Sequence, residues 1–257
     1  MKTTIKSVLT IFVIAASTLW FTACQKENVT PSGMGNDAGV TKSLNPASLV
    51  FPAQANMYGK NYSAWVAEWW KWDLQFDCDH FPTRDVDGSL ESQNQSGSVY
   101  FLAGKRMPFP GGGTRIITVT IPADVSLFFP LATVENEYPC VDVGEPGPGQ
   151  TVEQLLTSLT VPFVNAIDQL SLTIDGVPFT NLSAYKFISP MFTTSANADL
   201  ANCFDGCITG TPQQFITGGY FVMLKPLSAG THVIHRVAGA SSIFPFTFDI
   251  EYDITQQ

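Results

Sequence analysis

Short runs of apolar and β-branched residues recur along most of the chain, and glycine, proline, serine or aspartate bounds many of them. Runs of this kind between turn-forming residues are typical of β-strands. The turn-like segment 225–230 and the sequence Ile174-Asp175-Gly176-Val177 each predict an antiparallel hairpin between the flanking strands. The pattern predicts strands at residues 98–103, 115–121, 126–132, 171–174, 220–224, 231–237 and 244–254.

Two segments have the spacing of a helix. Residues 63–74 show helical periodicity, with Asn61 or Ser63 available as the N-cap. Residues 152–167 are expected to form a second helix, which Pro162 should kink or split in two. A parallel α/β fold is disfavoured because the helices do not alternate with the strands. We therefore expect a mainly β fold, a single-domain antiparallel β-sandwich that is jelly-roll-like and carries two or three short helices.

The composition narrows the classes of protein to which the chain can belong. Its 257 residues are 45% hydrophobic and only 14% charged, whereas globular chains usually carry about 25% charged residues. With 13 basic and 22 acidic side chains, the formal net charge is −9. This charge excludes a nucleic-acid-binding protein, which needs a basic surface. The 12% aromatic content excludes disorder over most of the chain.

The first residues predict export and lipid attachment. Lys2 and Lys6 precede an uncharged, mostly apolar stretch over residues 8–23. It is short for a spanning helix and typical of a secretory signal, with a permanent anchor helix as the alternative. The stretch ends in Phe-Thr-Ala before Cys24, which resembles the lipobox of bacterial lipoproteins, although phenylalanine stands where leucine is usual. The resemblance implies lipidation of Cys24 and attachment to the outer membrane through lipid alone.

The residues after Cys24 divide into a tether and a domain. The lysine–acid run at residues 25–28 is similar to the surface-export signal of Bacteroidota lipoproteins, which implies exposure at the cell surface. Gly, Ser, Asn and Thr are frequent in residues 29–46 and predict a flexible linker. We expect a signal peptide at 1–23, a lipidated cysteine with its tether at 24–46, and one β-sandwich domain at 47–257. These patterns leave the oligomeric state open.

Four further cysteines fit an oxidising compartment: Cys78, Cys140, Cys203 and Cys207. An even number in an exported chain predicts disulfides, and four cysteines allow three pairings. We favour Cys203–Cys207, within one short loop, together with Cys78–Cys140. A zinc site is the alternative, but Cys-x-x-x-Cys without a second pair of ligands is poor zinc spacing. No metal is expected at these cysteines.

The segment Trp65-Val-Ala-Glu-Trp-Trp-Lys-Trp72 is the least ordinary part of the sequence. At about 100° per residue, Trp65, Glu68, Trp69 and Trp72 fall on one face of a helix. A carboxylate among three indoles must be paired, be hydrated or have a raised pKa, because burial without a partner is costly. One interpretation is an aromatic helix packed on the sheet, with Glu68 bound to Arg115 or to backbone N–H groups. The other is an aromatic site with Glu68 as a general acid.

Two other acidic groups could bind ligands. The loop around Asp85 and Asp87 is similar to a calcium loop, but Asn94 stands where such loops use a bidentate glutamate. Calcium near Asp85 and Asp87 therefore competes with a solvated acidic loop. Glu135 and Glu137 lie two residues apart at the end of a predicted strand, so they should face one side. They form either a ligand shelf or ordinary rim charges.

The histidines and the common catalytic motifs add little. His232 and His235 are an odd number of residues apart in a predicted strand, so they should face opposite sides and cannot form a metal pair. The sequence contains no Gly-x-Ser-x-Gly elbow, no His-Glu-x-x-His helix and no phosphate-binding loop. A classical serine hydrolase or zinc protease is therefore disfavoured.

Several blocks resemble, in matching order, an uncharacterised family of secreted β-rich proteins of bacteria and some fungi. They lie within residues 60–254, at 62–72, 99–104, 121–123, 128–131, 175–178, 185–192 and 219–232. The resemblance implies no substrate. It does imply that family motif positions are occupied by Trp65, Glu68, Trp69, Trp72, Arg115 and His232. The cysteines at 78 and 140 depart from the family pattern, so no disulfide pairing is carried over from it.

The favoured function is a surface-anchored binding module. In this hypothesis an aromatic cleft built on Trp65, Trp69 and Trp72 binds a glycan or another small extracellular ligand, because sugar rings stack on indole faces. The hypothesis asks nothing unusual of the titrating residues and needs no cofactor.

The alternative function is an extracellular hydrolase or lyase. Glu68 would then act as general acid or base, with Glu135 or Glu137 as the second carboxylate. Arg115 and His232 would stabilise developing charge. A carboxylate pair across an open groove would favour the enzyme, whereas a dry, paired Glu68 would favour binding or a structural role.

Overall fold

The computed structural model describes residues 45–104, 113–242 and 245–257. The predicted signal peptide, Cys24 and all but the last two residues of the predicted tether lie outside these residues. Within the described ranges, no helix is both long and apolar enough to cross a membrane.

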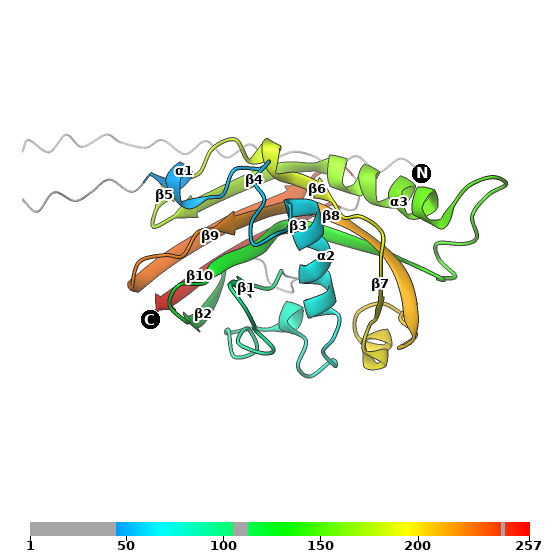
Figure 1. The fold of residues 1–257 in the computed structure, drawn as a ribbon, viewed down its shortest axis with the longest axis horizontal. Coiled ribbons are helices and arrows are strands. Elements are labelled where there is room, and N and C mark those ends of the chain that lie inside the picture. The colour runs from blue at the N-terminus through cyan, green and yellow to red at the C-terminus, as the bar shows by residue number, and fades with distance from the viewer. Residues whose placement is uncertain (1–44, 105–112, 243–244) are drawn as a thin grey trace, which may run out of the picture. The chain divides into compact units, whose positions relative to one another are not determined.

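The chain forms two five-stranded sheets (Figure 1), which confirms the expected mainly β sandwich with few helices. In the inner sheet the order is β1, β3, β8, β6, and β7 also pairs with β8. In the outer sheet the order is β2, β10, β9, β4, β5. Both sheets are mixed rather than wholly antiparallel, because β1 runs parallel to β3 and β2 runs parallel to β10. The inner strands are β1 (Val99–Phe101), β3 (Ser126–Tyr138), β6 (Lys186–Ile188), β7 (Phe192–Ser195) and β8 (Pro212–Leu224). The outer strands are β2 (Arg115–Ile121), β4 (Ile167–Ile174), β5 (Val177–Pro178), β9 (Gly230–Ala240) and β10 (Phe246–Gln256).

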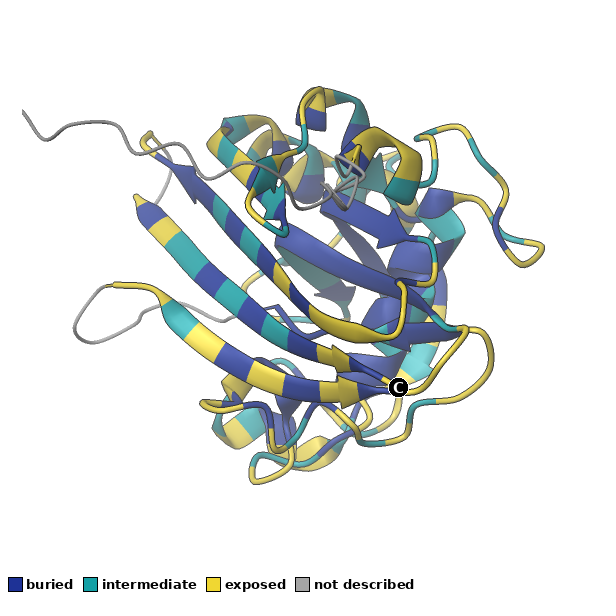
Figure 2. Ribbon diagram, turned by 90° about the vertical axis from the view of Figure 1, so that its left-hand side faces the viewer, coloured by how far each residue is buried: buried dark blue, intermediate teal, exposed yellow. Residues whose placement is uncertain are grey.

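The two sheets differ in how they are covered. Strand β2 alternates between buried and exposed residues, so one face of the outer sheet meets solvent. Strand β8 is buried without a break from Phe215 to Leu224, as expected for a strand covered on both faces. Figure 2 shows this contrast between striped and uniformly buried strands. The Phe129 and Tyr252 rings meet between the sheets with centroids 6.2 Å apart.

The helices cover the inner sheet. They are α1 (Pro46–Leu49), α2 (Tyr62–Asp73) and α3 (Val152–Ala166), with 3-10 turns at η1 (Pro82–Arg84), η2 (Leu182–Tyr185) and η3 (Ala198–Asn202). The Asn61 side chain accepts the N–H of Ala64 and caps α2, so the N-cap is the first of the two residues that the sequence offered. Pro162 does not split the helix in two, because α3 runs unbroken from Val152 to Ala166. Its buried stripe of Leu156, Thr160 and Val164 packs along β3 and β8.

One of the two expected hairpins forms. Strands β4 and β5 pair at Ile174 and Val177 across a two-residue turn, in which Asp175 and Gly176 both have positive φ. The hairpin expected around residues 225–230 is wrong, because β8 and β9 belong to different sheets. Both edges of β8 are already occupied, by β3 on one side and by β6 and β7 on the other. The segment 225–230 therefore crosses from the inner to the outer sheet.

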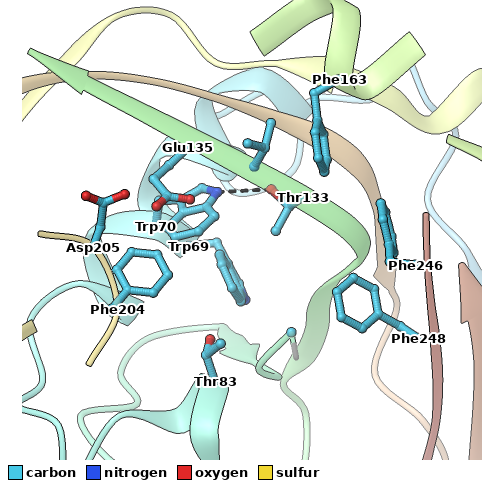
Figure 3. A pocket seen from close by; sticks show the side chains of 12 residues that line it. Trp69, Trp70, Thr83, Thr133, Glu135, Phe163, Phe204, Asp205, Phe246 and Phe248 are labelled. Carbon is cyan, nitrogen blue, oxygen red and sulfur yellow. Dashed lines mark hydrogen bonds between the residues drawn. The ribbon is translucent and has the colours of Figure 1, made fainter. Parts of the chain in front are cut away.

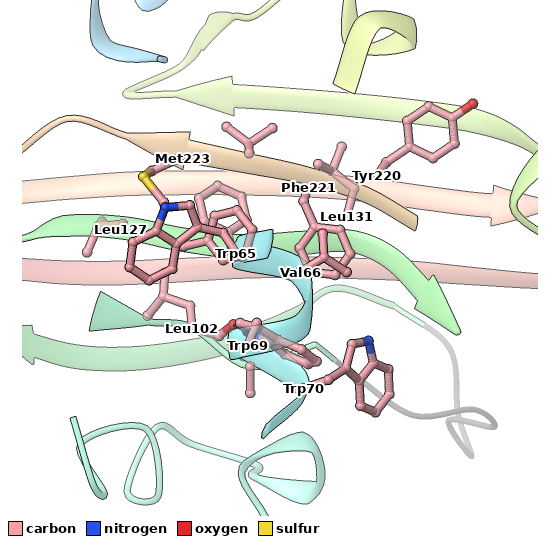
Figure 4. Close-up of a cluster of buried hydrophobic side chains, with 14 of the residues drawn as sticks. Trp65, Val66, Trp69, Trp70, Leu102, Leu127, Leu131, Tyr220, Phe221 and Met223 are labelled. Carbon is pink, nitrogen blue, oxygen red and sulfur yellow. Dashed lines mark hydrogen bonds between the residues drawn. The ribbon is translucent and has the colours of Figure 1, made fainter. Parts of the chain in front are cut away.

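Helix α2 supplies the largest side chains of the core. Figure 4 shows Trp65, Val66 and Trp69 packed against Leu102, Leu127, Leu131 and Phe221. The Trp69 ring lies 5.9 Å from that of Phe221 on β8. The Tyr62 ring stacks on Phe187 of β6 at 4.5 Å. Each fully buried aromatic side chain stabilises the fold by about 2–3 kcal/mol through removal of apolar surface from water.

Candidate functional site

The three tryptophans that the sequence placed around Glu68 are core residues. Trp65, Trp69 and Trp72 are 8%, 1% and 5% exposed. Their indole N–H groups donate to the backbone oxygens of Met57, Leu102 and Gln93 at 2.9–3.0 Å. These bonds tie three separate loops to α2 and satisfy donors that would be costly to bury alone. The expected recess of three indoles open to a ligand is therefore not formed.

Glu68 is an ion-paired, half-buried side chain in the middle of α2. Its two carboxylate oxygens lie 2.8 Å from the Lys60 ammonium and 2.9 Å from that of Lys71. The side chain is 32% exposed. Partial burial would raise its pKa, but the hydrogen bonds and charges of Lys60 and Lys71 outweigh this and lower it. A general acid needs the opposite shift, so this geometry does not favour the acid role that the sequence suggested.

Arg115 and His232 lie apart from Glu68 in other polar contacts. The Arg115 guanidinium donates to the backbone oxygen of Asp85 at 3.0 Å. His232 Nδ1 lies 2.8 Å from an Asp175 carboxylate oxygen, and its Nε2 lies 2.9 Å from the Ser228 backbone oxygen. A carbonyl can only accept, so Nε2 carries a proton and cannot take one from the Ser228 hydroxyl 3.4 Å away. This Ser–His–Asp set fastens the crossover segment 225–230 to the β4–β5 turn.

His232 and His235 face opposite sides of β9, as strand alternation predicted. His232 points inward in step with buried Ile234 and Arg236. His235 instead contacts Asp249 on β10 at 2.8 Å and is about one third exposed.

All four described cysteines form disulfides, but not in the favoured pairs. The bonds are Cys78–Cys203 and Cys140–Cys207. The register of the inner sheet explains the second bond, because Tyr138 at the end of β3 pairs with Gln214 near the start of β8. That pairing brings residues 140 and 207 together beyond the strand ends. Cys203 is bonded to Cys78, in the turn after α2, and not to Cys207 in its own loop.

The loop that is similar to a calcium loop forms a turn closed by backbone hydrogen bonds. Asp85 is buried, and its two carboxylate oxygens accept the N–H groups of Asp87, Gly88 and Leu90 at 2.7–3.1 Å. Asp87 accepts the N–H of Ser89. Since these oxygens hold the turn closed, the arrangement favours a structural role over calcium binding.

The structure places a pocket of about 320 Å³ beside α2, with Trp69 and Trp70 of that helix in its lining. Thr133, Val134 and Glu135 of β3 line one wall. Strand β1 pairs only with residues 126–128 of β3, so these wall residues lie past the end of β1. The ring-bearing side chains that line the pocket are Trp69, Trp70, Phe163, Phe204, Phe246 and Phe248. Of the predicted site residues, only Trp69 and Glu135 line it.

The pocket presents aromatic rings and acceptors. The Trp70 indole N–H donates to the Thr133 hydroxyl at 3.1 Å, and that hydroxyl donates to the Gly218 oxygen at 2.9 Å. The Trp70 ring is thereby fixed, with the Phe204 ring 6.1 Å away. Figure 3 shows the carboxylates of Glu135 and Asp205 close together beside Trp70, with phenylalanines of α3 and β10 across the pocket.

A bulge in β3 determines which face of the sheet its acidic side chains point to. The register of β3 against β8 shifts between Pro130 and Ala132, which moves the odd-numbered side chains after it to the α2 face. Asn136 accordingly points the other way and donates to Thr160 on α3 at 2.9 Å. Glu135 and Glu137 share one side, as predicted, and could offer oxygens within 4.8 Å of each other and of Asp205.

Glu137 is the most perturbed member of this group. It is 2% exposed, and its Oε1 has no hydrogen-bond partner among the described residues. Burial raises the pKa of Glu137 to about 7, and the negative charges of Asp205 and Asp142 add to the rise. Sequence reasoning missed Asp205, whose one signal was its place between two cysteines in Cys-Phe-Asp-Gly-Cys.

These features define a mainly β protein of two packed sheets, with two disulfides and one aromatic pocket bordered by acids. No family model matches the chain, and no curated protein does. Among solved structures, the chain is similar to PbICP-C in complex with falcipain-2, at 11% identity over 63% of this chain and 100% of that one, with a TM-score of 0.25. It is also similar to the cysteine protease inhibitor EhICP2 from Entamoeba histolytica, at 10% identity over 62% and 96% of the two chains, with a TM-score of 0.21. Likenesses this distant carry no functional argument.

Proposed function

We propose that the protein is a surface-anchored lipoprotein that binds a small extracellular ligand, and that the ligand enters the pocket between α2 and the end of β3. The ligand class we favour is a sugar unit of a glycan. The observation that carries the proposal is the pairing of a mostly aromatic wall with the carboxylates of Glu135 and Asp205 on one side.

The chemistry of the wall supports a ring-shaped ligand with several donors. The Trp70 indole N–H donates to the Thr133 hydroxyl, and the Trp69 indole N–H donates to the Leu102 backbone oxygen. Both indoles therefore offer only apolar surface to a ligand. The charged groups at the wall are the acceptors Glu135 and Asp205, and the Thr83 and Thr133 hydroxyls that also line it donate to Asp73 and Gly218. A sugar ring supplies both an apolar face and hydroxyl donors. The volume of about 320 Å³ lies at the lower end of the range for ligand pockets, about 300–1,000 Å³, and suits one or two rings.

Two features of the chain support the proposed location at the cell surface, one before the β-sandwich domain and one within it. Cys24, within its lipobox-like sequence, supplies the anchor. The two disulfides are consistent with an oxidising compartment such as a periplasm or cell surface, since cytosolic thiols stay reduced. Localisation of the intact chain in membrane fractions, with and without Cys24→Ala, tests this part separately.

A binding panel with matched variants tests the pocket. Tryptophan fluorescence would follow titration of the purified protein with neutral mono- and disaccharides and, as a second arm, with aromatic amines. Glu135→Gln should weaken binding by about tenfold, because a hydrogen bond to a charged group contributes about 1.5–3 kcal/mol. Glu68→Gln makes the same chemical change on the carboxylate paired with Lys60 and Lys71, and should leave affinity unchanged.

Two results would contradict the proposal. If Glu68→Gln abolished binding while Glu135→Gln did not, the binding site would lie beside Glu68 and not in the pocket. If aromatic amines alone bound, the pocket would stand but the glycan class would be wrong.

A further inference from the structure

Three carboxylates from two distant parts of the chain converge beside the pocket. Glu135 and Glu137 come from the end of β3, and Asp205 comes from the loop after η3. One oxygen of each can lie within 4.8 Å of the other two. Like charges this close repel one another, so their convergence needs a compensating group.

The loop that carries Asp205 is held on both sides. Cys203, two residues before it, is bonded to Cys78, and Cys207, two residues after it, is bonded to Cys140. The Asp205 N–H donates to the Leu200 oxygen at 3.1 Å, and Asp205 Oδ1 accepts the Cys207 N–H at 2.8 Å. The carboxylate is thus pre-positioned against the strand, which is what an ion site requires.

Glu137 gives the second, independent observation. Glu137 is only 2% exposed, and its Oε1 accepts no hydrogen bond from the described residues. Within the acidic group, one of its carboxylate oxygens lies within 4.8 Å of an oxygen of Glu135 and of an oxygen of Asp205. A buried carboxylate oxygen without a donor requires either a proton or a cation.

We propose that Glu135, Glu137 and Asp205 form a divalent-cation site, and that Ca²⁺ is the ion it fits best. All three ligands are hard oxygens, which Ca²⁺ and Mg²⁺ prefer. Calcium–oxygen bonds of about 2.3–2.6 Å allow oxygens on opposite sides of the ion to be about 5 Å apart, so three oxygens that all lie within 4.8 Å of one another can share one ion. Zn²⁺ fits less well, because the sulfur atoms beside Glu137 are bonded to each other in Cys140–Cys207 and are not thiolates.

A cation bound at this site would change the chemistry of the pocket. Glu135 and Asp205 border the pocket, so a bound cation would turn an acidic edge into a centre that accepts lone pairs from a ligand. The ion would also relieve the repulsion on Glu137. The inference stands without the proposed sugar ligand, because the three carboxylates and the anchored loop make the site by themselves.

The test uses Ca²⁺ alone, with no organic ligand. Isothermal titration and thermal unfolding of the metal-free protein would be measured with CaCl₂ and with MgCl₂ at pH 8. We expect Ca²⁺ to bind and to raise Tm, with Mg²⁺ weaker. Glu137→Gln and Asp205→Asn should each weaken Ca²⁺ binding by about tenfold or more, since affinity follows the number of charged ligands. Glu153→Gln, which removes an exposed acid at the start of α3, should behave as the wild type.

The outcomes separate a built site from general charge effects. An equal response of Glu137→Gln, Asp205→Asn and the wild type would overturn the proposal, as would no binding at millimolar Ca²⁺. If Glu137→Gln fails to fold, Asp205→Asn alone decides.

Discussion

Asp73, the last residue of α2, makes the stability of the protein depend on pH. Its side chain is fully buried, and its Oδ2 accepts the Thr83 hydroxyl hydrogen at 2.8 Å. Its Oδ1 has no partner among the described residues. Burial raises the pKa of Asp73 from 3.8 to about 7, although the hydrogen bonds from Thr83 oppose the rise.

The sign and size of the effect follow from proton linkage. Between about pH 4 and pH 7 the folded protein keeps a proton on Asp73 that the unfolded chain releases, so the free energy of unfolding falls as pH rises. The difference between 3.8 and about 7, at about 1.36 kcal/mol per pKa unit, amounts to about 4 kcal/mol. Asp73→Asn cannot ionise and should lose this part of the pH dependence. Between pH 4 and pH 8, the free energy of unfolding of Asp73→Asn should therefore rise by about 4 kcal/mol relative to that of the wild type.

Urea unfolding followed by tryptophan fluorescence at several pH values would measure this difference. Asp79→Asn is the matched control, because it removes an exposed carboxylate six residues further along. Its stability curve should run parallel to that of the wild type. If Asp73→Asn also ran parallel, the buried carboxylate would not be the titrating group, and the reasoning would be refuted.

Three further variants test a close backbone approach, a disulfide and an ion pair. Gly88→Ala should lower the free energy of unfolding by more than about 2 kcal/mol, since φ is +102° and a Cβ would lie 2.0 Å from the Thr118 oxygen. Unchanged thermal unfolding would show that Gly88 does not lie this close to Thr118 in solution. The pair Cys78→Ala with Cys203→Ala opens a crosslink between residues 125 apart and should cost about 2–5 kcal/mol by calorimetry, whereas an unchanged Tm would contradict the pairing. Glu68→Gln should cost less than about 1 kcal/mol in urea unfolding, because exposed ion pairs contribute little, and a larger loss would mean that the lysine contacts are structural.

Local patterns in the sequence predicted most of the fold. The N-cap Asn61, the Asp175-Gly176 turn and the strand over residues 115–121 match the structure because each depends on neighbouring residues only. The β8–β9 hairpin failed because sheet membership depends on which edges other strands have already occupied. The short strands β6 and β7 were missed, since three or four residues carry too little periodicity.

The candidate site was less predictable than the fold. Helical spacing put Trp65, Glu68, Trp69 and Trp72 together, but it could not show that the indoles would find backbone acceptors at distant residues and so face inward. Alternation correctly placed Glu135 and Glu137 on one side. Their meeting with Asp205 depends on the bulge in β3 and on two disulfides, and neither the bulge nor the cysteine pairing is encoded in local spacing.

The most direct test of the binding site is an NMR titration that follows the tryptophan indole N–H signals. The ligand would be the saccharide that binds best in the panel. The Trp70 and Trp69 signals should shift on titration, because their rings line the pocket, while Trp65 and Trp72 should stay in place. Shifts confined to Trp65 and Trp72 would instead locate the ligand on the Glu68 side of α2 and contradict the assignment.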